Sequence, residues 1–548
     1  MRFTLILHSH MPWVLHHGKW PHGSDWLTEA AIDTYLPLLA WLEHAESASA
    51  PVALTLGVTP ILAAQLAHPS FKTDLDEYFA QRFETLAESE ASLKSTGDDA
   101  LIPLVPFWKD HLTRLQELWQ RIDRDMVATL RHHAADGRIE LISSAATHGF
   151  LPLLARDESI RFQLLLGRAE HLRHFGVLPK GCWVPECAYR PAGPWQPWHS
   201  ATAVAHREGT ETHLRYAGFR WFVVDAHLAR AGAAWELYES EATRPLDSEA
   251  DVSPYRSFEV GHRPPRTRPV DVVIRDPETT AKVWSRHGGY PGDSRYLEFH
   301  KIRYPGGLKL WRVTDPAADL GDKAPYDPAA AREAATQHAR HFREVLHRIA
   351  SRATESDTSI VAPFDTELFG HWWFEGIDFL ADLYAQLDAA GDVTPATGSE
   401  LLADEPPDAV IELEPGSWGA NGDFSKWLNN ETAWTWERLW PLEERFWNAV
   451  PTAVEETHLA PIVEQAAREL LLAQSSDWQF IISTGAADDY ATKRFVEHCD
   501  ALEALLPAME GWGDVAHARY LADEYKRVDD PFPSLLGALA AASDLPAI

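Results

Sequence analysis

The sequence predicts an α/β fold built on a barrel of parallel strands, followed by an all-helical region. Three observations support this prediction. Short runs of β-branched and aromatic residues recur along the first 405 residues. Stretches with apolar residues three and four apart lie between them, and strands that alternate with helices are expected to be parallel. After residue 405 only helical patterns remain.

Seven runs have the composition of buried strands, and seven parallel strands favour a closed or nearly closed barrel. The predicted strands cover residues 3–7, 52–56, 139–143, 182–184, 221–224, 271–274 and 360–362. The predicted helices between them cover residues 32–42, 108–133, 162–175 and 331–349. The last is the clearest, because its apolar residues recur at spacings of three and four.

Two segments interrupt the alternation. Residues 78–106 predict an inserted helix and loop. Residues 227–269 are long, polar and rich in Pro, Arg and Glu, and residues 261–266 exclude regular structure. A loop of that length is either a lid or disordered. The lid-like loop 227–269 and the insertion near 78–106 thus belong to a predicted barrel domain, residues 1–405.

The character of the chain changes after the segment Asp404-Glu405-Pro406-Pro407. Helical patterns follow at residues 432–450, 453–473 and 492–506. We therefore expect a domain boundary near residue 405 and a C-terminal helical domain over residues 406–548.

Composition narrows the possible functions. Of the 548 residues, 45% are hydrophobic and 24% charged, which allows a large core and excludes a disordered chain. The 49 basic and 81 acidic residues give a net charge of −32. Such a charge repels nucleic acid and anionic membrane at long range, so a neutral substrate is expected. A contribution to solubility alone is the other explanation of the acidity.

The sequence also predicts the compartment. Cys182, Cys187 and Cys499 form no CxxC pair and no disulfide framework, which suits a reducing environment. The apolar run at the N-terminus is too short for a signal peptide, and no run approaches 18 apolar residues. We therefore expect a soluble cytoplasmic protein that does not span a membrane.

Polar residues follow nearly every predicted strand, where barrel enzymes place their chemistry. In chain order these residues are His8 and His10, Thr147 and His148, Glu186, Asp225 and His227, Arg275 and Asp276, and Asp365 with Glu367. Because the carboxyl ends of the strands converge, residues far apart in the chain are expected to share one pocket.

Two of these carboxyls differ from the rest. A single carboxylate after a strand is most often a helix N-cap, and Asp276 before Pro277 fits that interpretation. Glu186 and Asp365 instead have apolar and aromatic neighbours in sequence. Such surroundings shift carboxyl pKa values, as acid–base catalysis requires. We therefore predict that Glu186 and Asp365 are the catalytic pair.

Other motifs are less specific. His8 and His10 share a face of an extended chain and could bind metal, but a satisfied buried imidazole is the more common outcome and no third ligand is evident. No GxGxxG, P-loop, GxSxG or HExxH motif is present. Nucleotide-binding, serine hydrolase and zinc protease functions therefore lack their signatures.

Tryptophan is abundant, with 23 residues, and part of this surplus suits sugar stacking. Trp436 and Trp440 have the i, i+4 spacing of a helix core. Trp418 lies in the glycine-rich segment 416–422, which predicts a flexible loop with an exposed indole. Ligand stacking and a structural role are about equally favoured for Trp418.

Five segments resemble glycoside hydrolase family 57, most closely its 1,4-α-glucan branching enzymes. They are His8-Ser9-His10-Met11-Pro12-Trp13, Ala146-Thr147-His148-Gly149, the run from Gly181 to Tyr189 around Glu186, the run from Ala362 to Trp373 around Asp365, and Ser417-Trp418-Gly419 with Trp427. The two long runs are specific, and the matches keep one order along nearly the whole chain.

The resemblance implies a distorted (β/α)7 barrel with a C-terminal helical domain. It implies that Glu186 is the nucleophile and Asp365 the general acid/base of a retaining mechanism, with the two carboxyls about 5–5.5 Å apart. It requires no metal and no organic cofactor. It implies an α-glucan substrate, with contacts from Arg275, Gly292, Trp418, Asp477, His10, His148, Trp284 and Trp427.

Transfer to a sugar hydroxyl rather than to water requires a lid and an aromatic acceptor surface. Residues 227–269 depart from the family pattern, and either Tyr238 or Tyr255 is the candidate lid tyrosine. The indoles Trp418, Trp427 and Trp434–Trp440 supply the expected acceptor surface. The alternatives are an α-glucan hydrolase or 4-α-glucanotransferase on the same site, and a non-catalytic glycan-binding protein, which the acid pair disfavours. No protein partner is indicated.

Overall fold

The computed structural model describes residues 1–197, 204–232, 252–261, 268–285, 288–304, 307–315 and 317–543. Seven parallel strands run in the order β10-β1-β2-β3-β4-β7-β9. They are β1 (Arg2–Ser9), β2 (Leu54–Val58), β3 (Ile139–Ser144), β4 (Gly181–Trp183), β7 (Trp221–Val224), β9 (Asp271–Ile274) and β10 (Ser359–Asp365).

The two end strands of this series meet. Arg275, directly after β9, forms a parallel bridge with Val361 of β10, and the N–H of Asp276 donates to the Val361 carbonyl at 2.8 Å. The sheet therefore curls into a barrel that closes at one narrow contact. This confirms the predicted fold class, a distorted (β/α)7 barrel with a C-terminal helical region.

All seven predicted strands are present, with ends that differ by at most three residues. The prediction missed β11 (Thr394–Pro395), the hairpin of β5 (Gly193–Trp195) and β6 (Ala205–Arg207), and the edge strands β8 (Phe258–Val260) and β12 (Val410–Ile411). β8 pairs antiparallel with β9 inside the segment predicted to be an irregular lid. Strands of two or three residues are too short to show a periodic pattern.

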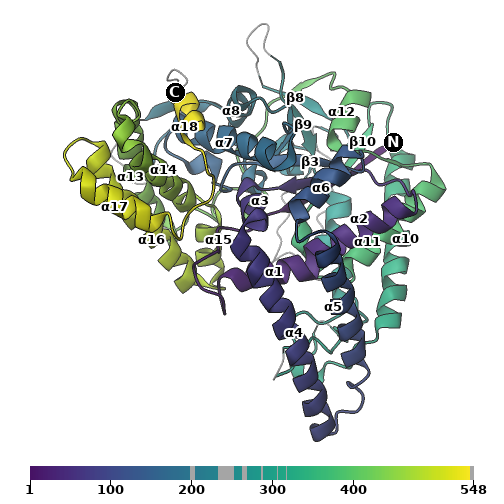
Figure 1. Ribbon diagram of the computed structural model, residues 1–548. Helices are drawn as coiled ribbons and strands as arrows, with labels where there is room; N and C mark the ends of the chain where they lie inside the picture. Colours follow the sequence, from purple (N-terminus) through teal and green to yellow (C-terminus); the bar gives the residue numbers. More distant parts are fainter. Residues whose placement is uncertain are drawn as a thin grey trace.

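Helices cover the outside of the barrel. They are α1 (Ser24–Ala30), α2 (Leu36–Ser47), α3 (Pro60–Ala67), α4 (Pro69–Thr96), α5 (Leu104–Arg121), α6 (Met126–Ala135), α7 (Asp157–Phe175), α8 (Thr210–Ala217), α9 (Pro277–Trp284), α10 (Pro328–Arg352), α11 (Gly376–Ala390) and α12 (Gly398–Asp404). A π-turn at Ala31–Tyr35 joins α1 to α2. The inserted segment is α4, which projects with α5 as an arm (Figure 1).

The prediction of a single helix over residues 108–133 is wrong, because this segment forms two helices, α5 and α6. Asp123 and Arg124 take positive φ angles of 53° and 58°, which end α5. Asp125 then caps α6 by accepting a hydrogen bond from the N–H of Ala128 at 2.9 Å. The apolar period continues across this break, so the pattern alone did not reveal it.

The C-terminal helices gather on one side of the barrel (Figure 1). They are α13 (Ala433–Ala453), α14 (Ala460–Ala473), α15 (Asp477–Thr484), α16 (Asp488–Met509), α17 (Val515–Tyr525) and α18 (Leu536–Ala542). The helix predicted from residue 453 starts only at Ala460, after a 3₁₀ turn at Thr457–Leu459. The predicted domain boundary near residue 405 stays a prediction.

These helices hold the loop that follows β1. The guanidinium of Arg494 on α16 donates to the carbonyl of Trp13 at 2.8 Å and lies 5.3 Å from the ring centre of Trp478. The indole of Trp13 donates to the carbonyl of Val528 at 2.9 Å. The loop that carries His10 is therefore fixed by residues from the end of the chain.

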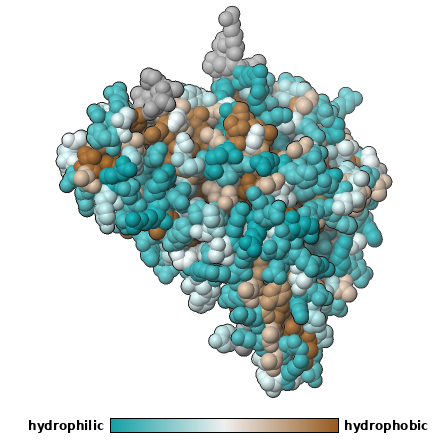
Figure 2. Space-filling view, in the orientation of Figure 1, coloured by the Kyte–Doolittle hydropathy of each residue, from teal (hydrophilic) through white to brown (hydrophobic). Residues whose placement is uncertain are grey.

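The outer surface matches the acidic composition. The face in Figure 2 is mostly hydrophilic, with an apolar stripe along the arm of α4 and α5. Within the described ranges, no helix has both the length and the apolar character to cross a bilayer.

Candidate active site

Glu186 stands at the carboxyl end of β4, in the one-turn helix Pro185–Cys187. Its backbone is left-handed, with φ 60° and ψ 23°, a strained conformation for a residue with a side chain. The indole N–H of Trp418 donates to Glu186 Oε2 at 2.9 Å, and the hydroxyl of Ser476 donates to Oε1 at 3.2 Å. The Trp418 backbone N–H also donates to the Glu186 carbonyl at 3.0 Å. The carboxyl is thus held from both sides.

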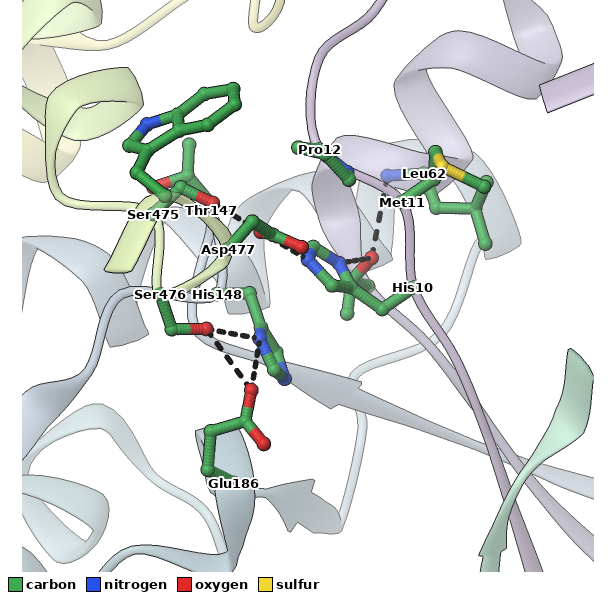
Figure 3. Close-up of polar contacts among 12 residues, drawn as sticks. His10, Met11, Pro12, Leu62, Thr147, His148, Glu186, Ser475, Ser476 and Asp477 are labelled. Carbon is green, nitrogen blue, oxygen red and sulfur yellow. Dashed lines mark hydrogen bonds and ion pairs between the residues drawn. The ribbon is translucent and has the colours of Figure 1, made fainter. Parts of the chain in front are cut away.

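A chain of hydrogen bonds leads to Glu186 from the strand β1. His148 Nδ1 lies 2.9 Å from Ser476 Oγ and 3.7 Å from Glu186 Oε1 (Figure 3). Because Ser476 gives its only proton to Glu186, His148 Nδ1 is the donor to Ser476. Burial lowers the pKa of His148 well below its usual value, so its ring is neutral. Its Nε2 then accepts from His8 Nε2, 3.0 Å away.

His10 lies on the same side of Glu186 as His148. Its Nε2 lies 2.8 Å from Asp477 Oδ2 (Figure 3). Its Nδ1 lies 3.0 Å from the hydroxyl of Thr59. Burial acts to raise the pKa of Asp477, but His10, His148 and Ser475 together lower it below its usual value. The His10 ring stacks on His148 with 4.1 Å between ring centres. Two imidazoles and a carboxylate therefore line one side of Glu186.

The predicted alternative for His8 and His10 was a shared metal ion. His8 instead stacks on Trp183, with ring centres 4.4 Å apart, and bonds to His148. His10, His148 and Asp477 offer ligand atoms within 4.8 Å of one another. However, imidazole lone pairs lie in the ring plane, and stacked rings do not direct them at a common ion. The geometry favours hydrogen bonding over metal binding here.

Asp365 ends β10 directly opposite His8 in the β1–β10 register. Burial raises the pKa of Asp365 to about 8, the carboxyl of Glu367 adds to the rise, and Arg275 opposes it. Burial also raises the pKa of Glu367 to about 7, although the hydroxyl of Tyr35 donates to it. The neighbourhood therefore favours a protonated Asp365 near neutral pH.

Burial raises the pKa of Glu186 to about 7, against the hydrogen bond from Trp418, and the charge of Asp365 raises it further. The two carboxyls thus interact electrostatically, with Asp365 the weaker acid. Between about pH 7 and pH 8 the dominant state has Glu186 ionised and Asp365 protonated. The predicted separation of the two carboxyls stays a prediction.

Arg275 closes the barrel beside this pair. Its guanidinium donates to Asp225 at 2.9 Å and to the hydroxyl of Thr280 at 3.0 Å, and it lies 5.2 Å from the ring centre of Trp418. The side chain is 1% exposed, so Arg275 supports the wall of the site. Its expected glucan contact stays a prediction. Asp276 caps α9, as the sequence predicted.

Most of the indoles predicted to form an aromatic acceptor surface are buried. Trp418 is 7% exposed and packs edge-on against Trp183, and Trp427 is 1% exposed and stacks on Phe150. Trp436 and Trp440 are buried too, as their helical spacing predicted. The glycine-rich loop is not free, because a bridge between Tyr189 and Gly416 ties it to the segment after β4. Trp434, the remaining indole of the predicted surface, is 37% exposed. The glucan contacts of Trp418 and Trp427 stay predictions.

The structure also corrects the prediction that Tyr255 is a candidate lid tyrosine. Tyr255 is buried, and its carbonyl accepts from the N–H groups of Thr358 and Ser359, at the amino end of β10. That is the end of the strand away from Asp365, so Tyr255 is not the lid tyrosine. Tyr238 lies outside the described residues, as does most of the segment 227–269.

Trp284 and Gly292 are the remaining residues predicted to contact glucan. Trp284 ends α9 and is partly buried. Gly292 lies in the one-turn helix Tyr290–Gly292 beside α9. Within the described ranges no hydrogen bond joins either residue to Glu186 or Asp365, and their glucan contacts stay predictions.

Sequence reasoning did not select Ser476, Thr59 or Tyr35. Ser476 had one available signal, its place beside Asp477 in the segment Ser475-Ser476-Asp477. The sequence carries no such signal for Thr59 or Tyr35. Thr59 caps α3, and Tyr35 lies in a short π-helix between α1 and α2. Their contacts with the site depend on how distant elements pack.

Comparison with known proteins defines the class to which this fold and site belong. The model of glycosyl hydrolase family 57 matches residues 4–414, and the model described as 1,4-alpha-glucan branching enzyme, C-terminal, matches residues 439–536. The chain belongs to glycosyl hydrolase family 57.

Individual relatives are similar over nearly the whole length of this chain. A 1,4-alpha-glucan branching enzyme of Thermococcus kodakarensis is 38% identical over 97% of this chain and 78% of its own. The crystal structure of a family 57 branching enzyme from Pyrococcus horikoshii superposes with a TM-score of 0.87 at 34% identity, over 98% of this chain and 96% of its own. An α-amylase structure from Thermotoga maritima gives a TM-score of 0.77 at 26% identity, over 98% and 99%.

Proposed function

We propose that this protein is a 1,4-α-glucan branching enzyme that acts by retaining double displacement. It would cleave an α-1,4 link of a neutral glucan and transfer the chain to a glucose 6-hydroxyl. The observation that carries the proposal is the pair Glu186 and Asp365, two partly buried carboxyls with pKa values of about 7 and about 8 at one mouth of the barrel. The match of residues 439–536 to a branching enzyme C-terminal model supports the choice of acceptor.

In the first step the protonated carboxyl of Asp365 gives its proton to the glycosidic oxygen. The ionised carboxylate of Glu186 attacks the anomeric carbon as the carbon–oxygen bond breaks. A covalent glucosyl-enzyme forms and the free end of the glucan leaves. Trp418 and Ser476 fix the direction of attack, because each donates to one oxygen of Glu186.

In the second step Asp365 is a carboxylate and acts as the base. It takes the proton of an incoming 6-hydroxyl, whose oxygen attacks the same carbon and displaces Glu186. Two inversions leave the anomeric configuration unchanged. With water as acceptor the same steps would give hydrolysis, so exclusion of water decides the product.

Substrate contacts follow from the walls of the site. We assign His10, His148 and Asp477 to the sugar bound at Glu186, since their side chains are 11%, 4% and 16% exposed beside it. Residues 1–405 would form the catalytic domain and residues 406–548 a helical domain that supplies Trp418, Ser476 and Asp477. We also propose a cytoplasmic location, which the three buried free thiols suit.

The test is the linkage of the product. The full-length protein is incubated with amylose, and the product is digested with isoamylase before chain-length analysis. New α-1,6 branch points that release short chains support the proposal. An increase in reducing ends without branch points contradicts it.

A second candidate is hydrolysis or 4-α-glucan transfer on the same carboxyls. The similarity to an α-amylase over 98% of this chain favours it. The same experiment separates the candidates, because hydrolysis gives only reducing ends and 4-α-glucan transfer gives new lengths without α-1,6 links. A non-catalytic glycan-binding protein would give neither.

A further inference from the structure

A cluster of possible metal ligands lies at the end of the barrel opposite the proposed active site. Glu46 is in the last turn of α2, shortly before β2, and His132 and His133 are in the last turn of α6, before β3. The proposed catalytic carboxyls follow the carboxyl ends of the strands, whereas these residues precede the amino ends. In barrel enzymes that face serves stability rather than chemistry.

The distances suit a small divalent cation. His132 Nε2 lies 3.2 Å from Glu46 Oε1, and His133 Nδ1 lies 3.5 Å from Glu46 Oε2. One ligand atom from each of the three residues lies within 4.8 Å of the others. With Zn–N and Zn–O bonds of about 2.0–2.1 Å, the edge of a zinc tetrahedron is about 3.3 Å. Small side-chain shifts would bring the three atoms onto such edges.

His133 supplies an independent sign of a missing ligand. Its side chain is fully buried, and neither ring nitrogen has a hydrogen-bond partner among the described residues. A buried imidazole whose nitrogens make no hydrogen bond is costly unless something occupies its lone pair.

The surroundings of Glu46, His132 and His133 also favour a bound cation. The last turns of α2 and α6 both end here, and helix C-termini carry partial negative charge. Asp136, the C-cap of α6, lies 3.6 Å from His132 Nε2 and is available as a fourth ligand. His132 and Asp136 are 56% and 42% exposed, so an ion can reach the cluster from solvent.

We propose that Glu46, His132 and His133 form a zinc-type metal site that cross-links α2 and α6, with Asp136 or water as the fourth ligand. Two imidazoles and a carboxylate are a ligand set that zinc accepts. The bound ion would join segments 86 residues apart in sequence and stabilise the amino end of the barrel. It takes no part in the proposed glucan chemistry.

The experiment titrates Zn²⁺ alone into the full-length protein after chelator treatment, by calorimetry. One equivalent is expected to bind in the wild type and to be lost in His132→Ala and in Glu46→Gln. Both substitutions alter partly exposed side chains, so folding is preserved. The matched control is His44→Ala, an exposed histidine of α2 outside the cluster, which should bind Zn²⁺ like the wild type.

Two further measurements complete the test. Co²⁺ should give the visible absorption of a four-coordinate site in the wild type and in His44→Ala only. Zn²⁺ should raise the Tm of these two proteins by about 2–5 °C and leave the other two unchanged. The two other clusters of histidine and acid, around His10 and around His498, remain intact in every variant. Binding that persists in His132→Ala and Glu46→Gln, or no binding in the wild type, overturns the proposal, and neither result bears on glucan activity.

Discussion

The two carboxyls of the proposed active site stand in different surroundings, although both follow strands of one sheet. Glu186 receives hydrogen bonds from Trp418 and Ser476, which belong to the last third of the chain. Asp365 has the carboxyl of Glu367 as its neighbour, which raises its pKa. Donors favour a carboxylate, and a second carboxyl disfavours it. The difference teaches that residues from the last third of the chain, and not the barrel alone, favour the ionised form of Glu186.

The largest expected effect comes from removing either carboxyl. Glu186→Gln and Asp365→Asn should each lower kcat on amylose by about 10³-fold or more, because one loses the nucleophile and the other the proton donor. Glucan binding, measured by affinity electrophoresis, should remain in both. Glu88→Gln serves as a control, since that carboxyl is exposed on α4. A wild-type rate in Glu186→Gln would remove it from the mechanism.

The next effect concerns pH. In the wild type, kcat/KM should rise as Glu186 ionises near pH 7 and fall as Asp365 ionises near pH 8, which gives a narrow bell. Trp418→Phe removes the indole donor and keeps most of the packing, so the acid limb should move to higher pH. The rate at pH 6.5 should fall about 10-fold. An acid limb that does not move would mean that Trp418 has no influence on Glu186.

The free energy of unfolding should fall as Glu186 ionises, although the same ionisation raises the activity. The pKa of Glu186 rises from 4.5 to about 7 on folding, so the native state binds the proton more tightly than the unfolded state. The carboxyl therefore costs stability as the pH rises from about 4.5 through 7, by up to about 2–3 kcal/mol. Glu186→Gln should be more stable than the wild type at pH 8 and by a smaller margin at pH 5. Thermal unfolding at both pH values measures this, and an equal difference at both contradicts it.

The smallest effect is expected at Ser476. Its hydrogen bond to Glu186 is 3.2 Å, longer than that of Trp418, and His148 remains 3.7 Å away in Ser476→Ala. The acid limb should shift in the same direction as in Trp418→Phe, with a loss in kcat/KM of about 2–5-fold. A larger shift than in Trp418→Phe would reverse the ranking of the two donors.

Much of the barrel could be predicted from the sequence, because a strand is recognised from a short stretch of neighbouring residues. The strands at residues 221–224 and 271–274 were predicted with their observed bounds, since short runs of β-branched and aromatic residues between helical patterns are typical of buried strands. The short edge strand β8 was not, because it lies within the polar segment 227–269. The break between α5 and α6 was missed because the apolar spacing continues across it.

The residues of the candidate site also fall into those that local sequence predicts and those that it does not. Glu186 and Asp365 could be chosen from their apolar neighbours in sequence, which are a local property. The donors to Glu186 come from residues 232 and 290 positions away, and no local pattern records such a contact. Trp418 was expected in an exposed loop because its glycines suggest flexibility, whereas pairing between Tyr189 and Gly416 buries it. Long-range packing, rather than composition, decided these residues.

The most direct test of the assigned roles is to trap the covalent intermediate. The Asp365→Asn variant is incubated with an α-maltosyl fluoride, whose leaving group needs no proton, so the first step proceeds while the second lacks its base. The account predicts one added maltosyl group, located by mass spectrometry of the digested protein on Glu186. An adduct on any other residue, or a released sugar of inverted anomeric configuration, would contradict it.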